Sequence, residues 1–554
     1  MPLWGAMLRL KIAAAGISWL AITAAGVKFA FSPRSGRDTG NADQSRLKTA
    51  VMNLAPPVFV AGIVAAEAFA LFWVIEWLID SFPRLVDDPI AHQLCCTGTA
   101  ISLTGMLNNY WQLMYPGSLA PLVLMIACMG ACFYIASRVD INEFSMHYFY
   151  KNRLVRAYLG ASRNRAHRLP NAFTGFDLDD DIRMRRFQYS DPTQARDAVT
   201  DCRPSYAGPY PIINTALNIT RGEELGIQNR KAESFIFTPL WSGFDFTRRQ
   251  ASVRKTALSE FAFQRTDLFG TPTEGALLGT AMAISGAAFN ANAGFHTQPA
   301  IAFLLTVFGV RLGWWAGNPR TGKWTQPSPS VGLLYLLKEL TANTSTNEDF
   351  VLLSDGGHFE NMGLYELIRR RCRFIILSDA EEDEKFKLEG IGGAIRKCRD
   401  DFGVVINLNL DALQPLGDPA VSRLHYSLGT IIYPGECGCG RLIYIKSSVT
   451  GDEPIDVIEF RKRHSEFPHT STMNQFFDES HFESYRALGH HIASQVFTRD
   501  MPALPLAPGQ TATGYIESLF EAIDEELAQR LARPSQVAKE TIASVMNTDS
   551  AKEE

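Results

Sequence analysis

The residues best suited to chemistry end an apolar run at positions 355–358, where Asp355 is followed by Gly356, Gly357 and His358. A carboxylate at the end of a buried strand can act as a general base, bind a metal ion, or cap the turn that follows. The two glycines can adopt backbone angles that other residues avoid, and they allow a ligand to approach the main chain. No second carboxylate or histidine stands at clear ligand spacing from Asp355, so neither a metal nor a cofactor is expected. Base catalysis and capping both remain open.

Hydrophobic periodicity predicts the elements that position Asp355. Residues 350–354 read as a buried strand, 362–372 as an amphipathic helix capped by Asn361, and 373–379 as a second strand. A strand, helix and strand in this order form a right-handed parallel unit. In an open parallel sheet, functional groups gather at the carboxyl ends of the strands, which is where Asp355 would lie.

Further elements of an α/β body follow toward the C-terminus. Periodicity predicts helices over 391–403, 478–498 and 513–532, and strands over 404–410, 428–434 and 441–449. We therefore expect an α/β domain over 141–500, followed by a C-terminal helix and a loose polar tail over 501–554.

Residues 1–140 differ in composition and predict a helical membrane region. No Asp, Glu, Lys or Arg occurs between His92 and Ser137. The runs 57–79 and 117–137 each approach the roughly 20 apolar residues that a spanning helix needs. Basic residues flank both outer ends, which favours a two-span hairpin in the inner (cytoplasmic) membrane, with the α/β body in the cytosol. A secretory signal peptide at the N-terminus and a wholly soluble helical domain are the alternatives.

Composition narrows the function classes. The 554 residues suggest roughly two to four domains. Lys and Arg total 53 against 58 for Asp and Glu, so nothing in the bulk charge indicates nucleic-acid binding. The nine cysteines show no Cys-x-x-Cys spacing. This argues against a disulfide framework or a zinc ribbon and is typical of a reducing compartment.

The segment LLSDGGHFENMGLYELIRRRCRFIILSDA, residues 352–380, resembles the Asp-Gly-Gly region of patatin-like phospholipases. The likeness is to the large membrane-associated bacterial members, and the cytosolic phospholipase A group has the same pattern. It extends over about 140–495. Other similar stretches are NRLVRAYLGASR (152–163), the segments 210–240 and 279–315, and FPHTSTMNQFFDESHFESYRALG (467–489).

This resemblance implies a fold and a reaction. The expected fold is a patatin-like three-layer body with a parallel sheet, incomplete here and preceded by the transmembrane region. The expected reaction is hydrolysis of a lipid acyl ester, of phospholipase or esterase type, by a Ser/Asp dyad. Asp355 matches the dyad base, Gly356 and Gly357 match its motif, and membrane phospholipid is the substrate. The alternative function is a catalytically inactive membrane-anchored protein that binds lipid or a partner.

The expected nucleophile is missing from the sequence. A Gly-x-Ser-x-Gly elbow needs small residues two positions before and after the serine, because the turn is tight. The nearest match is Ser285 in AISGA, where Ala283 and Ala287 replace both glycines. Its position matches a small-residue segment of the family that lies between nucleophile and base. We therefore expect an upstream segment or a partner chain to supply the elbow, and we keep Ser285 as a weaker candidate.

Overall fold

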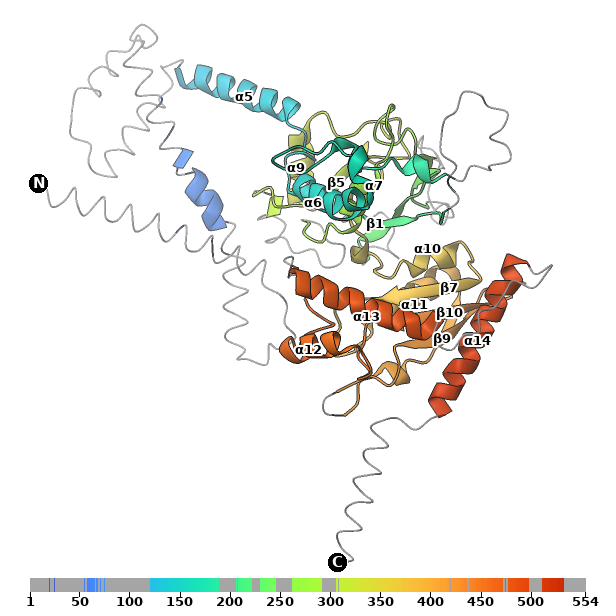
Figure 1. The fold of residues 1–554 in the computed structure, drawn as a ribbon. Coiled ribbons are helices and arrows are strands. Elements are labelled where there is room, and N and C mark those ends of the chain that lie inside the picture. The colour runs from blue at the N-terminus through green and yellow to red at the C-terminus, as the bar shows by residue number, and fades with distance from the viewer. Residues whose placement is uncertain are drawn as a thin grey trace, which may run out of the picture. The chain divides into compact units, whose positions relative to one another are not determined.

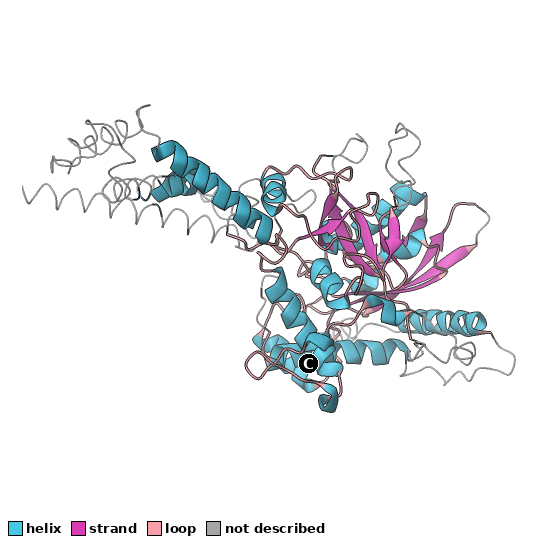
Figure 2. Ribbon diagram, turned by 90° about the horizontal axis from the view of Figure 1, so that it is seen from above, coloured by secondary structure: helices cyan, strands magenta, loops and turns pink. Residues whose placement is uncertain are grey.

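The chain forms two compact units, residues 1–359 and 360–554. The computed structural model describes residues 120–188, 206, 208–221, 230–245, 262–290, 305–306, 308–417, 420–435, 438–471, 474, 477–497 and 511–532, with scattered positions between 19 and 74. Each unit has its own sheet (Figures 1 and 2). The predicted domain boundaries near residues 140 and 500 stay predictions.

The first unit is built on a six-stranded sheet in the order β4-β3-β2-β1-β6-β5. Every pair of neighbours in it is antiparallel. The strands are β1 Ile213–Asn218, β2 Ala232–Phe237, β3 Trp241–Gly243, β4 Phe263–Arg265, β5 Trp314–Gly317 and β6 Phe350–Asp355. The helices are α5 Ala120–Arg138, α6 His147–Leu154, the π-helix η2 Val155–Gly160, α7 Leu278–Ser285 and α9 Gly332–Leu340. Short 3-10 turns are η3 Arg165–His167, η4 Leu178–Asp180, η5 Met184–Phe187 and η8 Gly356–His358.

Strand β6 lies between two helical layers, because side chains alternate between the two faces of a strand. Val351 and Leu353 pack into a core with residues of α7 and η2. Phe350 and Leu352 belong to a second core, against which Tyr335 of α9 packs. Both faces of β6 are therefore buried, which explains its unbroken apolar run.

The second unit contains the mixed sheet β7-β10-β9-β8. Its strands are β7 Phe374–Asp379, β8 Val405–Leu408, β9 Tyr426–Ile432 and β10 Cys439–Lys446; only the β7–β10 pair is parallel. Its helices are α10 Leu364–Arg369, α11 Glu389–Phe402, α12 Ile455–Arg463, α13 Glu479–Phe497 and α14 Ala512–Ala532, with the 3-10 turn η9 Asp411–Leu413. Apolar side chains of α12, α13 and α14 pack on one face of β9 and β10. The predicted helices and strands of this region are confirmed, although Gly363 and not Asn361 is the N-cap of α10.

The predicted parallel, patatin-like body is wrong. Strand β6 pairs with β1 and β5, both antiparallel, and β7 belongs to the other sheet. The segment 350–379 is therefore no β-α-β unit, although its two strands and its helix exist. The physical reason is that an apolar run buried on both faces has the same sequence signature in either type of sheet.

The predicted transmembrane region and multi-pass localisation are contradicted as well. Among the described residues, no helix has both the length and the apolar character that a membrane span requires. The predicted span 117–137 corresponds to α5, which has 19 residues and includes Ser137 and Arg138 at its end. The predicted span 57–79 lies partly outside the described residues.

Candidate functional site

Asp355 is the last residue of β6 and follows Val351 and Leu353 on the face toward α7. Burial raises the pKa of its half-buried carboxyl group to about 6, although the hydrogen bond from Gly357 N favours the ionised form. Such a group is mostly ionised at neutral pH and still basic enough to accept a proton. This is the property that a general base needs.

One oxygen of Asp355 caps the turn that follows. Its Oδ1 accepts a hydrogen bond from Gly357 N at 2.7 Å, and Asp355 is the N-cap of η8. No hydrogen bond reaches Oδ2 from any residue that the structure describes. The capping role left open by the sequence is therefore present, and it leaves the second oxygen available.

Gly356 and Gly357 do not have the role that the sequence suggested. Neither Gly356 nor Gly357 has a positive φ, so no left-handed angle is required there. A Cβ on Gly356 would come within 3.0 Å of the main-chain oxygen of Asn214. Gly356 is thus needed for close approach to β1, and not for the approach of a ligand from that side.

The fold brings Ser285 into the neighbourhood of Asp355 but does not join them. Ser285 is the last residue of α7, and its Oγ donates to the main-chain oxygen of Asn214 at 2.7 Å. The next residue along β1, Thr215, is the register partner of Asp355. In the part of the chain that the structure describes, no hydrogen bond links Ser285 to Asp355.

Ser285 is also poorly placed to be a nucleophile. An elbow serine stands before a helix, where main-chain N–H groups can stabilise an oxyanion. Ser285 stands at the carboxyl end of α7, where the helix dipole is negative. An oxyanion formed there would meet carbonyl oxygens, so the helix would oppose the reaction.

Tyr150 of α6 is a member of the site that the sequence did not reveal. The negative charge of Asp355 adds to burial in raising the pKa of the Tyr150 phenol, which places the two groups near each other. A Cβ on Gly286 would lie only 2.5 Å from the Tyr150 hydroxyl. No hydrogen bond to that hydroxyl is formed by any described residue. Its spacing from Asp355 in the sequence gave no signal, because only the fold brings α6 to this edge.

Three polar side chains are joined by hydrogen bonds next to the end of β6. Asn218 Nδ2 donates to Ser354 Oγ at 2.7 Å, and Ser354 Oγ is 2.7 Å from His358 Nδ1. Ser354 is fully buried. These hydrogen bonds therefore fix the position of His358 and the end of β6. Ser354 itself is inaccessible to a substrate.

The second strand-end carboxylate, Asp379, has a different environment. Lys446 Nζ lies 3.1 Å from Asp379 Oδ2, and Tyr444 donates to the same oxygen. The two members of this ion pair are buried. Asp379 is thus neutralised by a fixed cation, whereas Asp355 has no ion pair among the described residues.

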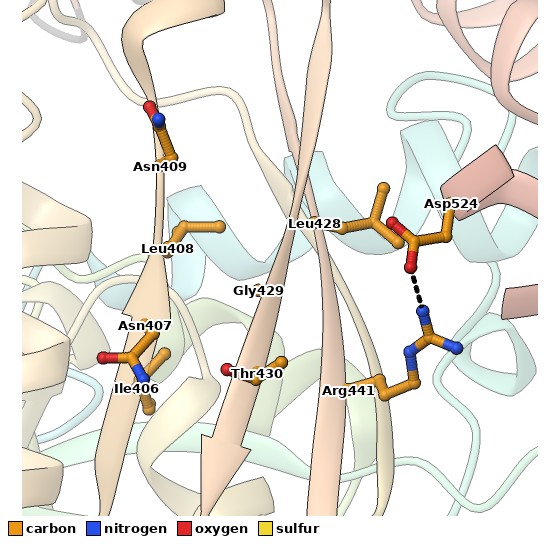
Figure 3. A pocket seen from close by; sticks show the side chains of 9 residues that line it. All are labelled: Ile406, Asn407, Leu408, Asn409, Leu428, Gly429, Thr430, Arg441 and Asp524. Atoms are coloured by element: carbon orange, nitrogen blue, oxygen red, sulfur yellow. Dashed lines mark hydrogen bonds and ion pairs between the residues drawn. The ribbon is translucent and has the colours of Figure 1, made fainter. Parts of the chain in front are cut away.

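Two hollows lie elsewhere on the described part of the chain. One, of about 270 Å³, lies in the first unit and is bordered by Lys151 and Ile284, the chain neighbours of Tyr150 and Ser285. Asp355 does not line it. The other, of about 590 Å³, lies over β8 and β9 (Figure 3). Its charged groups, Arg441 and Asp524, pair with each other at 2.6 Å and are not free for chemistry.

Comparisons with family models, curated proteins and solved structures found no match to this chain.

Proposed function

We propose that this chain takes part in hydrolysis of carboxylic esters of lipid type, with Asp355 as the general base. The observation that carries this proposal is the position of Asp355 at the end of β6, where Oδ1 accepts from Gly357 N and Oδ2 accepts no hydrogen bond from a described residue. Burial there raises the pKa of this carboxyl group to about 6. The unbonded Oδ2 removes a proton from an attacking hydroxyl while that hydroxyl bonds to the ester carbonyl carbon. The proton then passes to the alcohol oxygen as its bond to that carbon breaks, and water, deprotonated by the same carboxylate, releases the acyl group as the acid.

Tyr150 supports the same reaction. Its raised pKa keeps the phenol protonated at neutral pH, so it is a hydrogen-bond donor. Beside Asp355, it would donate to the carbonyl oxygen as negative charge develops there. A base and a donor are thus present, and the attacking seryl hydroxyl comes from a partner chain.

The choice of lipid acyl esters rests on the resemblance of residues 352–380 to the Asp-Gly-Gly region of patatin-like phospholipases. In that resemblance the carboxylate serves as base without an intervening histidine. The position of Asp355 is consistent with this role, because the histidine nearest in sequence, His358, contacts Ser354.

One observation favours the rival function, a catalytically silent protein that binds lipid or a partner. The serine with the most elbow-like neighbours, Ser285, uses its hydroxyl to hold Asn214. In that case Asp355 only caps η8.

Hydrolysis of a fluorogenic short-chain ester and of a labelled phospholipid by the full chain tests the proposal. Asp355→Asn keeps the cap to Gly357 and removes the base, so we expect kcat/KM to fall by about 100-fold or more. The exposed Asp179→Asn is the matched control and should leave the rate unchanged. Equal rates for Asp355→Asn and the wild type would exclude Asp355 as base. A folded wild type that hydrolyses neither substrate would favour the silent protein.

A further inference from the structure

A cluster of metal-ligating side chains occurs in the second unit, away in the sequence from Asp355. Its potential ligand atoms all lie within 4.8 Å of one another. We name it the two-histidine cluster; it consists of His425, Asp452, Glu453 and His491.

Three separate elements bring these residues together. His425 directly precedes β9, and His491 lies on α13. Asp452 and Glu453 lie in the loop between β10 and α12. The spacing is too irregular for a sequence motif, which explains why the sequence predicted no metal.

The buried half of the cluster is fixed by its neighbours. Glu453 is buried, and its two oxygens accept hydrogen bonds from the main-chain N–H groups of Thr450, at 2.6 Å, and Gly451, at 2.9 Å. Among the described residues, only His425 comes within ion-pairing distance of Glu453, with 3.8 Å between Nε2 and Oε1. The carboxylate is therefore oriented, and its charge acts on Arg461 without a direct ion pair between the two.

The His425 ring is held through both nitrogens. Its Nδ1 lies 3.1 Å from Ser448 Oγ, and its Nε2 lies 3.0 Å from Thr450 Oγ1. The Thr450 hydroxyl also donates to Asp452 Oδ1 at 2.6 Å and lies 3.2 Å from Glu453 Oε1, so it links three members of the cluster. In metal sites a hydrogen bond to one nitrogen of a histidine orients the other toward the ion, and Ser448 is placed to form that bond.

The second half of the cluster consists of His491 and Asp452, and Gln495 holds both. Arg530 donates to Gln495 Oε1 at 3.2 Å, and the amide nitrogen of Gln495 lies 2.8 Å from Asp452 Oδ2 and 2.8 Å from His491 Nε2. His491 Nε2 is 3.2 Å from Asp452 Oδ1. An imidazole nitrogen and a carboxylate oxygen at this separation match two ligands of one ion.

We infer that the two-histidine cluster binds a divalent transition-metal ion, with zinc as the best fit. Two imidazoles and two carboxylates match the ligands of zinc, and four protein ligands are typical of a structural site. Tetrahedral zinc places its ligands about 3.3 Å apart. The separations of 3.2 Å and 3.8 Å bracket that value, and the widest separation, up to 4.8 Å, requires closure by about 1.5 Å. The ion would tie the β10–α12 loop to β9 and α13.

Cobalt titration of the full chain, after removal of metals with a chelator, tests this inference. We expect visible absorption bands of tetrahedral Co²⁺ at one equivalent per chain, lost when Zn²⁺ is added. His491→Asn should weaken Co²⁺ binding at least about 10-fold. His490→Asn is the matched control, because His490 is the exposed neighbour on the same helix, and it should bind as the wild type does.

Thermal unfolding gives a second readout that does not depend on colour. Zn²⁺ should raise the Tm of the wild type and of His490→Asn, and should not raise that of His491→Asn. Mg²⁺ should have no effect, because it prefers an all-oxygen octahedral site. Co²⁺ binding of equal strength in His491→Asn and the wild type would overturn the inference. Absence of Co²⁺ bands in a folded wild type would do the same.

Discussion

The hydroxyl of Ser285 donates to the main-chain oxygen of Asn214 at 2.7 Å, one residue before the register partner of Asp355. The serine with the most elbow-like neighbours therefore links α7 to β1. Ser285→Ala removes this hydrogen bond and should lower the free energy of unfolding by about 1 kcal/mol. It should leave ester hydrolysis within about 3-fold of the wild type, since the proposed reaction does not use Ser285. Urea unfolding and kcat/KM measure the two effects, and a complete loss of hydrolysis in a folded variant would make Ser285 the nucleophile.

The pH dependence of hydrolysis should report Asp355. The ionised form is the base, and burial raises its pKa to about 6. The value of kcat/KM should therefore rise with pH, with an inflection near pH 6, and level off above it. An inflection near 4, the ordinary range of an aspartate, would show that the titrating base is another group.

Tyr150→Phe tests whether the Tyr150 hydroxyl contributes to hydrolysis or to the stability of the fold. Loss of the phenol hydroxyl should lower kcat/KM by about 100-fold, as for removal of one oxyanion donor. The Tm should stay unchanged, because no described residue forms a hydrogen bond to this hydroxyl. Tyr134→Phe, on an exposed side chain of α5, is the control and should change neither quantity. An unaltered rate in Tyr150→Phe would remove Tyr150 from the site.

Individual helices and strands were predictable from the sequence, but the distant parts of the chain that they contact were not. The apolar run ending at Asp355 and the amphipathic pattern of α13 each determine one element, because burial imposes a period on nearby residues. The pairing of Asp355 with Thr215 depends on contacts between distant parts of the chain. No local period encodes that pairing. The antiparallel sheet, the place of Tyr150 and the two-histidine cluster all depend on such contacts.

The ionised carboxylate of Asp355 should also lower the stability of the folded protein at high pH. Its pKa is raised in the folded protein from 3.8 to about 6, so between these values the folded state binds more protons than the unfolded state. Stability contributed by the protonated form is complete below pH 3.8 and is lost as pH rises through 6. Asp355→Asn should therefore be more stable than the wild type by about 1–3 kcal/mol at pH 8 and equal to it near pH 4. Urea unfolding at both pH values checks this, with Asp179→Asn as control. If Asp355→Asn were less stable than the wild type at pH 8, burial would not be what raises the pKa of Asp355.

Asp379 provides the opposite case, because its charge is balanced. Lys446→Met removes the cation and leaves a buried carboxylate beside Tyr444, which should lower the free energy of unfolding by about 3–5 kcal/mol. Adding Asp379→Asn to Lys446→Met removes the unpaired charge and should restore part of that loss, which urea unfolding of single and double variants measures. Arg441→Met is the matched control, because Arg441 lies on the same strand, β10, and its partner Asp524 is exposed. It should cost less than about 1 kcal/mol. Equal losses for Lys446→Met and Arg441→Met would mean that the pair at Asp379 is solvated, and the contrast with Asp355 would disappear.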